Sequence, residues 1–381
     1  MKVYLDNAAT TMVDKEVIKA MLPYLDKKIG NPSSIHSFGR EAKIAIESSR
    51  EKIMQKLGAK NGKLIFTSGG TESNNLAIKG VAFSCKGKGK HIITTGIEHK
   101  SVLEVVDWLK KYMGFKVTYL PVDHYGFINL EKLENSITKD TILVSIIHGN
   151  NEIGTIQNIK EIGKICNDKD VYLHTDACQS FTKTELDVEK MYIDMVSINS
   201  HKIHGPKGVG ALYISEKVKI TPLLHGGGQE HEIRGGTENV PGIVGFAKAT
   251  EVISEKDIER MEKLRDKLIS GVLKEIVDSK LNGHPKLRLC NIANFTFKDV
   301  EGESLLMRLD MHGIACSTGS ACSSRSLKPS HVLLAIGLKL EEAHGSLRMS
   351  LSKYTTSEEI SYTLEKLKNE VEELRKISPR L

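Results

Sequence analysis

The sequence lacks several features that define specialised classes of protein. Its six cysteines are scattered over 381 residues without a CxxC pair, so no disulfide framework is indicated and we expect a reducing environment. No apolar run is long enough to cross a membrane, and the charged residues 1–6 are not followed by the apolar segment of a signal peptide. We therefore expect a cytoplasmic protein with no membrane partner.

A strong imbalance of charge is also missing. The net charge is +6, and lysines alternate with acidic residues along the predicted helices. This pattern is typical of solvated helix faces rather than of a nucleic-acid-binding stripe, so we expect no direct nucleic-acid partner. No GK[ST] follows the glycines at 69–70, which argues against a Walker A site for a nucleoside triphosphate.

The remaining composition is that of an ordinary globular protein. Hydrophobic residues make up 40% of the chain and charged residues 27%, and the length allows two domains. From residue 64 onward, short apolar runs alternate with helical stretches, which predicts βαβ units on a mostly parallel, seven-stranded sheet with an α/β fold. The predicted strands are 64–67, 92–94, 117–120, 142–147, 171–174, the apolar run after Asp194, and 209–214.

The other segments complete the expected organisation. Asp14 is the predicted N-cap of a helix that stops at Gly30, and a second helix is predicted at 39–57. After the sheet, a charged helical stretch at 241–278 is expected to link two domains. The tail is expected to form an α+β unit with strands 289–296 and 347–351 and helices 303–311 and 357–376.

One lysine follows a buried strand. Lys202 stands between two histidines in a polar turn, and glycines force a tight path before the next strand. A lysine at the end of a buried strand loses solvation, which lowers its pKa and frees a neutral amine to attack a carbonyl. On this stretch alone, an exposed lysine in a surface loop is an equally good interpretation.

Glycines open the helix after the first strand of the sheet. In Ser68-Gly69-Gly70-Thr71, backbone N–H groups can approach an anion, the helix N-terminus favours negative charge, and Thr71 can donate a hydroxyl. This pattern predicts a phosphate site. A simple N-cap would explain Thr71 but explains the two glycines less well.

Three polar residues follow other strands. Asp176 can keep a pyridine nitrogen protonated because the ion pair favours both charged forms, and Gln179 can reach a neighbouring oxygen. His99 can stack on a ring or move protons near neutral pH. Taken singly, Asp176 could equally cap a helix, and His99 is better explained as a capping histidine at the surface.

Together these groups match the needs of one cofactor, pyridoxal 5'-phosphate (PLP). The phosphate loop would anchor it, the carboxylate would make its ring an electron sink, and Lys202 would hold its aldehyde as a Schiff base. Because Thr71, Asp176 and Lys202 all follow strands of one predicted sheet, the catalytic interpretation of the lysine is now favoured.

A second chemical group lies in the tail. Small polar residues surround Cys322, which predicts an exposed, mobile loop at about 315–328 and makes Cys322 a poor structural cysteine. An exposed cysteine near positive charge can be a nucleophilic thiolate and can carry a persulfide. Cys316 and Cys322 are also candidate ligands of a metal or an iron–sulfur cluster, although their spacing is not characteristic.

The chain closely resembles the cysteine desulfurases of the class V aminotransferase family (NifS/IscS type). The resemblance runs nearly end to end, and the order and spacing of its motifs are highly specific. The matching motifs are Tyr4-Leu5-Asp6-Asn7-Ala8-Ala9-Thr10-Thr11, Gly30-Asn31-Pro32-Ser33-Ser34, Asn150-Asn151-Glu152-Ile153-Gly154, His201-Lys202 with Gly205-Pro206-Lys207-Gly208, Gly226-Gly227-Gly228-Gln229-Glu230, Gly236-Thr237-Glu238-Asn239 and Gly319-Ser320-Ala321-Cys322.

The resemblance assigns expected roles. It implies that Lys202 is the Schiff-base lysine, that His99 stacks on the ring and handles protons, and that Cys322 is the nucleophile that takes sulfur. The other implied roles are pairing of the pyridine nitrogen by Asp176, bonding of the ring hydroxyl by Gln179, phosphate binding by Gly70, Thr71 and His201 with Thr237 of the partner subunit, and substrate binding by Asn151 and Arg348, the latter gripping a carboxylate.

The resemblance also implies a fold and a quaternary structure. The fold is that of the fold-type I PLP enzymes, with a large domain at 12–255 and a small domain formed by 1–11 and 256–381. The protein is expected to be a homodimer with its sites at the subunit interface. Asn199 replaces a usual phosphate-binding serine, Gly235 a serine, Met12 a proline, and Ser352-Lys353 a glycine-arginine pair. None of these departures alters Lys202 or Cys322.

The expected reaction removes sulfur from L-cysteine. The products are L-alanine and a persulfide on Cys322, whose sulfur would pass to an iron–sulfur scaffold protein or to tRNA or cofactor thiolation. A selenocysteine lyase or an aminotransferase on the same scaffold is the alternative enzyme, and a catalytically idle sulfur- or cluster-binding scaffold is the alternative outside enzymes.

Overall fold

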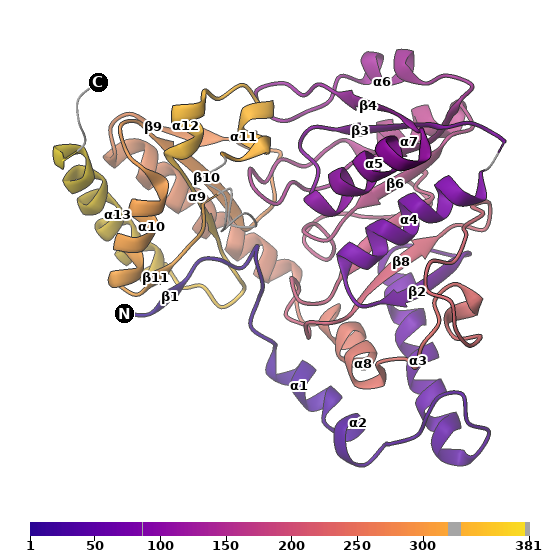
Figure 1. Ribbon diagram of the computed structural model, residues 1–381. Coiled ribbons are helices and arrows are strands. Elements are labelled where there is room, and N and C mark those ends of the chain that lie inside the picture. Colours follow the sequence, from indigo (N-terminus) through magenta and orange to yellow (C-terminus); the bar gives the residue numbers. More distant parts are fainter. Residues whose placement is uncertain (86, 319–328, 378–381) are drawn as a thin grey trace.

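The computed structural model describes residues 1–85, 87–318 and 329–377, and a seven-stranded sheet forms the centre of its larger part (Figure 1). The strand order is β2-β8-β7-β6-β5-β3-β4, and only β8 runs against the others among the described strands. The strands are β2 (Lys63–Thr67), β3 (His91–Thr95), β4 (Lys116–Leu120), β5 (Thr141–Ser145), β6 (Tyr172–Asp176), β7 (Met195–Asn199) and β8 (Gly210–Ile214).

Helices cover both faces of this sheet. Val81 and Val106 belong to the core between the sheet and α4 and α5, whereas Ile53 and Phe246 belong to the core on the opposite face. The helices of this part are α1 (Lys15–Met21), α2 (Pro23–Asp26), α3 (Ser37–Lys56), α4 (Gly70–Ser84), α5 (Lys100–Met113), α6 (Leu130–Ser136), α7 (Ile159–Asp168) and α8 (Val240–Ala249), with a short 3-10 turn, η1 (Glu230–Glu232). Such a layered α/β arrangement buries both faces of a mostly parallel sheet.

The tail forms a second unit with its own core. An antiparallel sheet of order β12-β10-β9 and the parallel pair β1-β11 pack against α9, α10 and α13 around residues such as Phe295 and Leu367. The N-terminal residues Val3 and Leu5 belong to this core. The elements are β1 (Val3–Tyr4), α9 (Glu255–Glu275), β9 (Ser279–Asn282), β10 (Ile292–Phe297), α10 (Gly302–Met311), β11 (Ile314–Ala315), α11 (His331–Ala335), α12 (Leu340–His344), β12 (Ser346–Ser350) and α13 (Ser357–Ile377).

The predicted fold class and the seven-stranded sheet are confirmed, and three details are corrected. The helix that begins after Asp14 ends at Met21 and not at Gly30, since Pro23 begins α2. The stretch 241–278 is two helices, α8 and α9, and not one. The predicted strand 289–296 is β10 at 292–297, and it pairs with β9, which the sequence did not indicate. The predicted domain limits stay a prediction.

The sheet determines where a site can lie. β3, β5, β6 and β7 are parallel, so their carboxyl ends lie at one edge, where the following loops leave room for a ligand. Arg348 on β12 of the tail unit lies at the same place, because its guanidinium bonds to the backbone of Asn151. No helix in the described part of the chain is long and apolar enough to span a bilayer.

Candidate active site

A cavity of about 300 Å³ lies at the carboxyl ends of the parallel strands. The segments that line it include the start of α4, the N-cap of α5, the residues after β6 and β7, and β12. Most of the predicted site residues line this one cavity: Gly70, Thr71, His99, Asn151, Asp176, Gln179, Asn199, His201, Lys202 and Arg348. The fold thus brings together side chains from positions 70 to 348.

The start of α4 forms one end of the cavity. The first N–H groups of a helix have no acceptor inside it, and Gly69, the N-cap, offers no side chain to accept from them. Gly70 must be a glycine, since a Cβ there would lie 2.5 Å from the Sγ of Cys178. The free N–H groups and the positive end of the helix dipole make this end suitable for a phosphate.

Asp176 stands at the end of β6 as a buried carboxylate. Its Oδ2 accepts a hydrogen bond from Asn74 Nδ2 at 2.8 Å, and its Oδ1 accepts from the backbone N–H of Cys178 at 2.9 Å. Burial by itself raises the pKa of this carboxyl, but the electrostatic interaction with the His99 imidazole and these hydrogen bonds outweigh burial and hold the pKa below its usual value. Asp176 is therefore ionised at neutral pH and can pair with a protonated ring nitrogen.

A hydrogen-bonded chain connects Asp176 to His99. Asn74 Nδ2 also donates to the Ser101 hydroxyl at 2.8 Å, and the Ser101 hydroxyl lies 2.7 Å from His99 Nδ1. Because the backbone N–H of Ser101 donates to the same Nδ1 at 3.1 Å, we assign the proton of the neutral ring to Nε2. Burial, only partly opposed by the charge of Asp176, lowers the pKa of His99, so the neutral form dominates at pH 7.

Lys202 lies in the turn that joins β7 to the antiparallel β8. The backbone carbonyl of His201 accepts from the N–H and the hydroxyl of Thr11, both at 2.9 Å, so the N-terminal segment fixes this turn. The ring of His201 lies 3.2 Å from the Thr10 hydroxyl. Burial, together with the positive charge of Lys202, lowers the pKa of His201 to about 4, so this histidine is neutral at pH 7.

Two buried amides at the cavity have oxygens without partners. Gln179 Oε1 and Asn199 Oδ1 accept no hydrogen bond from the described residues, while Gln179 Nε2 donates to the carbonyl of Ala8 at 2.8 Å. A buried polar atom without a partner costs free energy, so these atoms indicate that a polar ligand completes the site. The phosphate-binding helix end, the ionised Asp176, the amine of Lys202 and these amides together fit PLP.

Arg348 borders the cavity from β12. Its Nη1 donates to the carbonyl of Asn151 at 2.9 Å, and its Nη2 donates to Asp6 Oδ1 at 3.0 Å. Its Nε is buried and has no partner among the described residues. A guanidinium that is held on one side and keeps a donor unsatisfied on another is suited to bind a substrate carboxylate.

Two predicted residues are not among those that line this cavity. Thr237, which the resemblance assigns to the partner's site, lines a separate cavity of about 120 Å³ together with Thr67 and Ser68. Cys322 lies outside the described residues, as does most of its loop. Cys316 is half-buried, and burial raises the pKa of its thiol to about 12, so it is a poor thiolate. Within residues 1–85, 87–318 and 329–377, no group of three or more His, Cys, Asp or Glu could hold a metal ion.

Sequence reasoning missed the residues that support the site. Asn74 lies one helical turn after Gly70, and this i, i+4 spacing within the glycine motif was the available signal. Ser101 lies two residues after His99, the distance at which an N-cap receives a backbone N–H. Cys178 gave no such signal, because its role against Gly70 depends on the pairing of distant segments.

Comparisons with known proteins agree with this geometry. A family model described as aminotransferase class-V matches residues 3–363. The chain is 55% identical over 381 residues to cysteine desulfurase IscS of Dictyoglomus turgidum, covering 99% of this chain and 96% of the relative. A solved NifS-like protein matches with a TM-score of 0.90 at 42% identity, covering 97% of this chain and 99% of that one. A structure titled SspA in complex with cysteine matches with a TM-score of 0.83 at 40% identity, covering 93% and 100%.

Proposed function

The chain belongs to the class V aminotransferase family, and on that premise we propose that it is a PLP-dependent cysteine desulfurase. The observation that supports this most strongly is the convergence of the predicted residues on one cavity with Asp176 ionised at one wall and Lys202 at another. The structure titled as a complex with cysteine, at 40% identity, supports L-cysteine as the substrate.

Different residues of the cavity would hold different parts of PLP. The N-terminus of α4 with Gly70 and Thr71 would take the phosphate, Asp176 the ring nitrogen, and Lys202 the aldehyde. His201, neutral at pH 7, and Asn199 would complete the phosphate end, and Gln179 would bond the ring hydroxyl. When bound, PLP supplies an electron sink for bonds that break at the substrate's carbon atoms.

The protein residues bind the substrate and move its protons. Arg348 Nε, with the side chain of Asn151 beside it, would bind the carboxylate of L-cysteine. The Lys202 amine would take the α-proton and later return one. The neutral ring of His99 presents a proton at Nε2, since its Nδ1 accepts from Ser101. The chain from Asp176 through Asn74 and Ser101 would hold that ring in place.

The sulfur step needs no external oxidant. The Cys322 thiolate attacks the substrate sulfur, an S–S bond forms, and the bond between that sulfur and Cβ breaks. The electron pair of the broken bond stays with the carbon skeleton, which gains a proton at Cβ and leaves as L-alanine. The persulfide sulfur is thereby oxidised to the sulfane level while the carbon is reduced, so the electrons balance.

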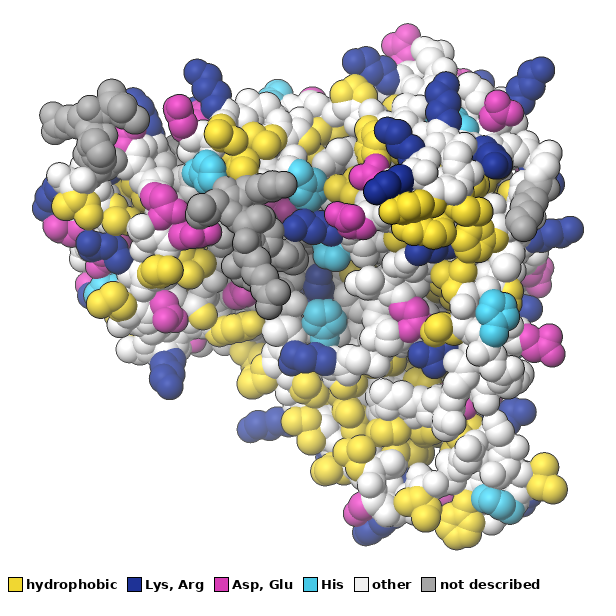
Figure 2. All heavy atoms as spheres, viewed as in Figure 1, with side chains coloured by type: hydrophobic (Ala, Val, Ile, Leu, Met, Phe, Trp, Pro, Cys, Tyr) yellow, Lys and Arg dark blue, Asp and Glu magenta, His cyan; other side chains and the backbone are white. Residues whose placement is uncertain are grey.

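The expected partners follow from this chemistry. A persulfide must be handed on, so we propose an iron–sulfur scaffold protein or another thiol acceptor, and a cytoplasmic location where thiols stay reduced. We also propose a homodimer. Large apolar side chains are exposed on and around α1, α2 and the start of α3, namely Ile18, Leu22, Leu25, Ile29, Ile35 and Phe38. Figure 2 shows hydrophobic side chains gathered over the lower part of the molecule. A second copy is the simplest cover for such a surface.

The experiment that tests the function compares two cysteine variants. We expect the wild-type protein to release alanine from L-cysteine, and mass spectrometry to place one extra sulfur on Cys322. Cys322→Ala should abolish sulfide release. Cys316→Ala removes the cysteine that is nearest to Cys322 in the sequence, and it should leave sulfide release within about twofold of wild type because the raised pKa of Cys316 makes it a poor thiolate. Undiminished sulfide release by Cys322→Ala would show that another mechanism operates.

A further inference from the structure

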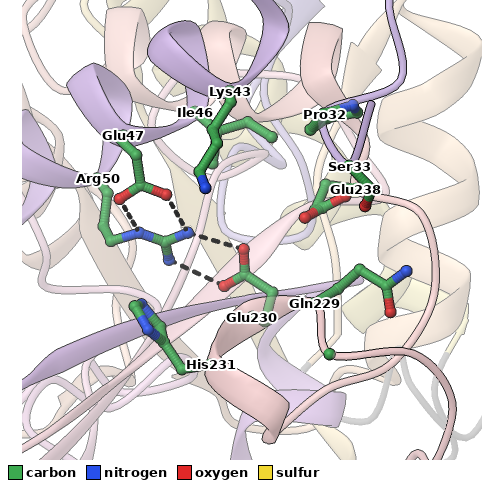
Figure 3. A pocket seen from close by; sticks show the side chains of 11 residues that line it. Pro32, Ser33, Lys43, Ile46, Glu47, Arg50, Gln229, Glu230, His231 and Glu238 are labelled. Atoms are coloured by element: carbon green, nitrogen blue, oxygen red, sulfur yellow. Dashed lines mark hydrogen bonds and ion pairs between the residues drawn. The ribbon is translucent and has the colours of Figure 1, made fainter. Parts of the chain in front are cut away.

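A loop beside the α4 end of the cavity is held in place by an ion pair with α3. We call this loop, residues 224–239, the brace loop. Glu230 of this loop is buried, and its two carboxylate oxygens bond to Nη1 and Nη2 of Arg50, each at 2.9 Å. Figure 3 shows Arg50 held between Glu47 and Glu230. Glu230 also accepts the backbone N–H of Phe66 at 2.7 Å, on the strand that leads to the phosphate loop.

The brace loop has an unusual backbone at this anchor. Glu230, His231 and Glu232 have φ angles of 45°, 57° and 64°, which lie in the left-handed region. Residues other than glycine rarely adopt this conformation, and surrounding contacts must impose it. Further along the loop, a Cβ at Gly235 would lie 2.8 Å from the backbone of Gly226, so the backbone at the start of the loop packs closely against the backbone near its end. The loop therefore delivers Arg234 to a defined position.

Arg234 meets an acidic residue in the first turn of α4. Its Nε donates to Glu72 Oε1 at 3.0 Å, and the other oxygen of Glu72 accepts the backbone N–H of Ser68 at 2.8 Å. Glu72 thus shapes the phosphate loop. Both side chains are mostly buried, with exposed fractions of 23% and 19%. Neither is among the residues that line the 300 Å³ cavity, so neither is placed to touch the ligand there.

This arrangement creates an electrostatic conflict that the ion pair resolves. A carboxylate in the first turn of α4 weakens the attraction of that helix end for a phosphate, because both are negative. We propose that Arg234 is a positioning residue that neutralises Glu72, so that Glu72 can shape the phosphate loop without repelling the phosphate of the cofactor. This inference rests on the proposed function, since it takes PLP as the ligand.

The test is a double-variant series read by cofactor binding. The full-length chain is freed of cofactor and titrated with PLP and with pyridoxal, which has the same ring and aldehyde but no phosphate. Arg234→Gln should raise the PLP dissociation constant about tenfold, equivalent to about 1.4 kcal/mol, and leave pyridoxal binding unchanged. Glu72→Gln together with Arg234→Gln should bring PLP affinity back to within about threefold of wild type, because no unpaired charge remains.

Two controls make the result specific. Arg308→Gln breaks a similar ion pair, 2.8 Å long, with Glu370 in the tail unit and should leave PLP affinity unchanged. Glu72→Gln alone keeps the acceptor for Ser68 and should leave PLP binding unchanged or tighter; weaker binding would overturn the proposal even if Arg234→Gln did not fold. An equal loss for PLP and pyridoxal, or no recovery in the double variant, would also overturn it. If the wild-type chain binds no PLP, the proposed function itself fails.

Discussion

One lysine of the tail unit joins it to the first helix. Lys353 Nζ donates to Asp14 Oδ2 and, at 2.8 Å, to the carbonyl of Val252. The Tyr354 hydroxyl donates to the same carboxylate at 2.6 Å. The other oxygen of Asp14 caps α1 through the N–H of Glu16. The tail thus holds the start of the first helix.

We expect Lys353→Met to destabilise the protein at neutral pH. The change removes a charge-assisted hydrogen bond, worth about 1.5–3 kcal/mol, and leaves the mostly buried Asp14 without its counter-charge. A total near 3 kcal/mol corresponds to a fall of roughly 4 °C in the melting midpoint for a chain of this size. Lys353→Arg keeps the charge and should melt within about 2 °C of wild type.

The loss should depend on pH in a defined direction. Burial acts to raise the pKa of Asp14, but the hydrogen bonds from Lys353, Tyr354 and Glu16 outweigh it and lower the pKa from 3.8 to about 2. A carboxyl with a depressed pKa stabilises the fold above its unfolded value and loses this contribution as pH falls toward the folded one. The gap between wild type and Lys353→Met should therefore be full above pH 5 and shrink from pH 4 toward pH 2.

Circular dichroism melts at pH 7 and pH 3 provide the measurement. A double-variant cycle with Asp14→Asn should give a coupling of about 1–3 kcal/mol, since the two side chains share one hydrogen bond. If Lys353→Met and wild type have the same melting midpoint at pH 7, or if the destabilising effects of Lys353→Met and Asp14→Asn are additive, the contact contributes nothing and the reasoning is refuted.

Two further predictions concern Arg348, which lines the cavity, and the buried Glu98, which precedes the cavity residue His99. Arg348→Lys should raise the KM for L-cysteine at least tenfold with a smaller change in kcat, because lysine cannot contact Asp6, Asn151 and a carboxylate together; an unchanged KM in steady-state assays would exclude carboxylate binding. Burial raises the pKa of Glu98 to about 8, so the folded state binds more protons than the unfolded one between pH 4.5 and 8, and stability falls as pH rises. Glu98→Gln should flatten this fall in melts at pH 5 to 8; an equal slope in both proteins would contradict it.

The sequence predicted the parts of the fold that depend on local pattern. The alternation of apolar runs and helices predicted the seven-stranded sheet, and Asp14 marked the true start of α1. β9 was not predicted because three of its four residues, Ser279, Lys280 and Asn282, are polar and give no alternating apolar pattern. It is a strand because Asn282 bonds across to Asn294 and Thr296, at 2.7 and 2.9 Å, contacts that no local pattern reveals.

The same division applies to the site. The residues proposed to touch a ligand mostly follow strands or open helices, so their positions could be predicted from the order of elements together with the resemblance. The residues that support them come from pairings between distant segments. Asn74 joins Asp176 to Ser101, and Arg234 joins a loop to Glu72, 162 positions away. Neither pairing has a signature in the one-dimensional sequence, because both depend on how the elements pack.

The binding of the N-terminal segment to β12 has a consequence for the timing of synthesis. Asn7 donates to the carbonyl of Ser350 at 2.8 Å across 343 positions, and Asp6 accepts from Arg348 across 342. A ribosome adds about 5–20 residues per second, so the earlier partner emerges roughly 17–70 s before the later one. The turn that carries Lys202 can pair locally with its two strands in that interval. The wall that we propose binds the substrate carboxylate cannot form in that interval, so a nascent chain would form the proposed cofactor end of the cavity before the proposed substrate end.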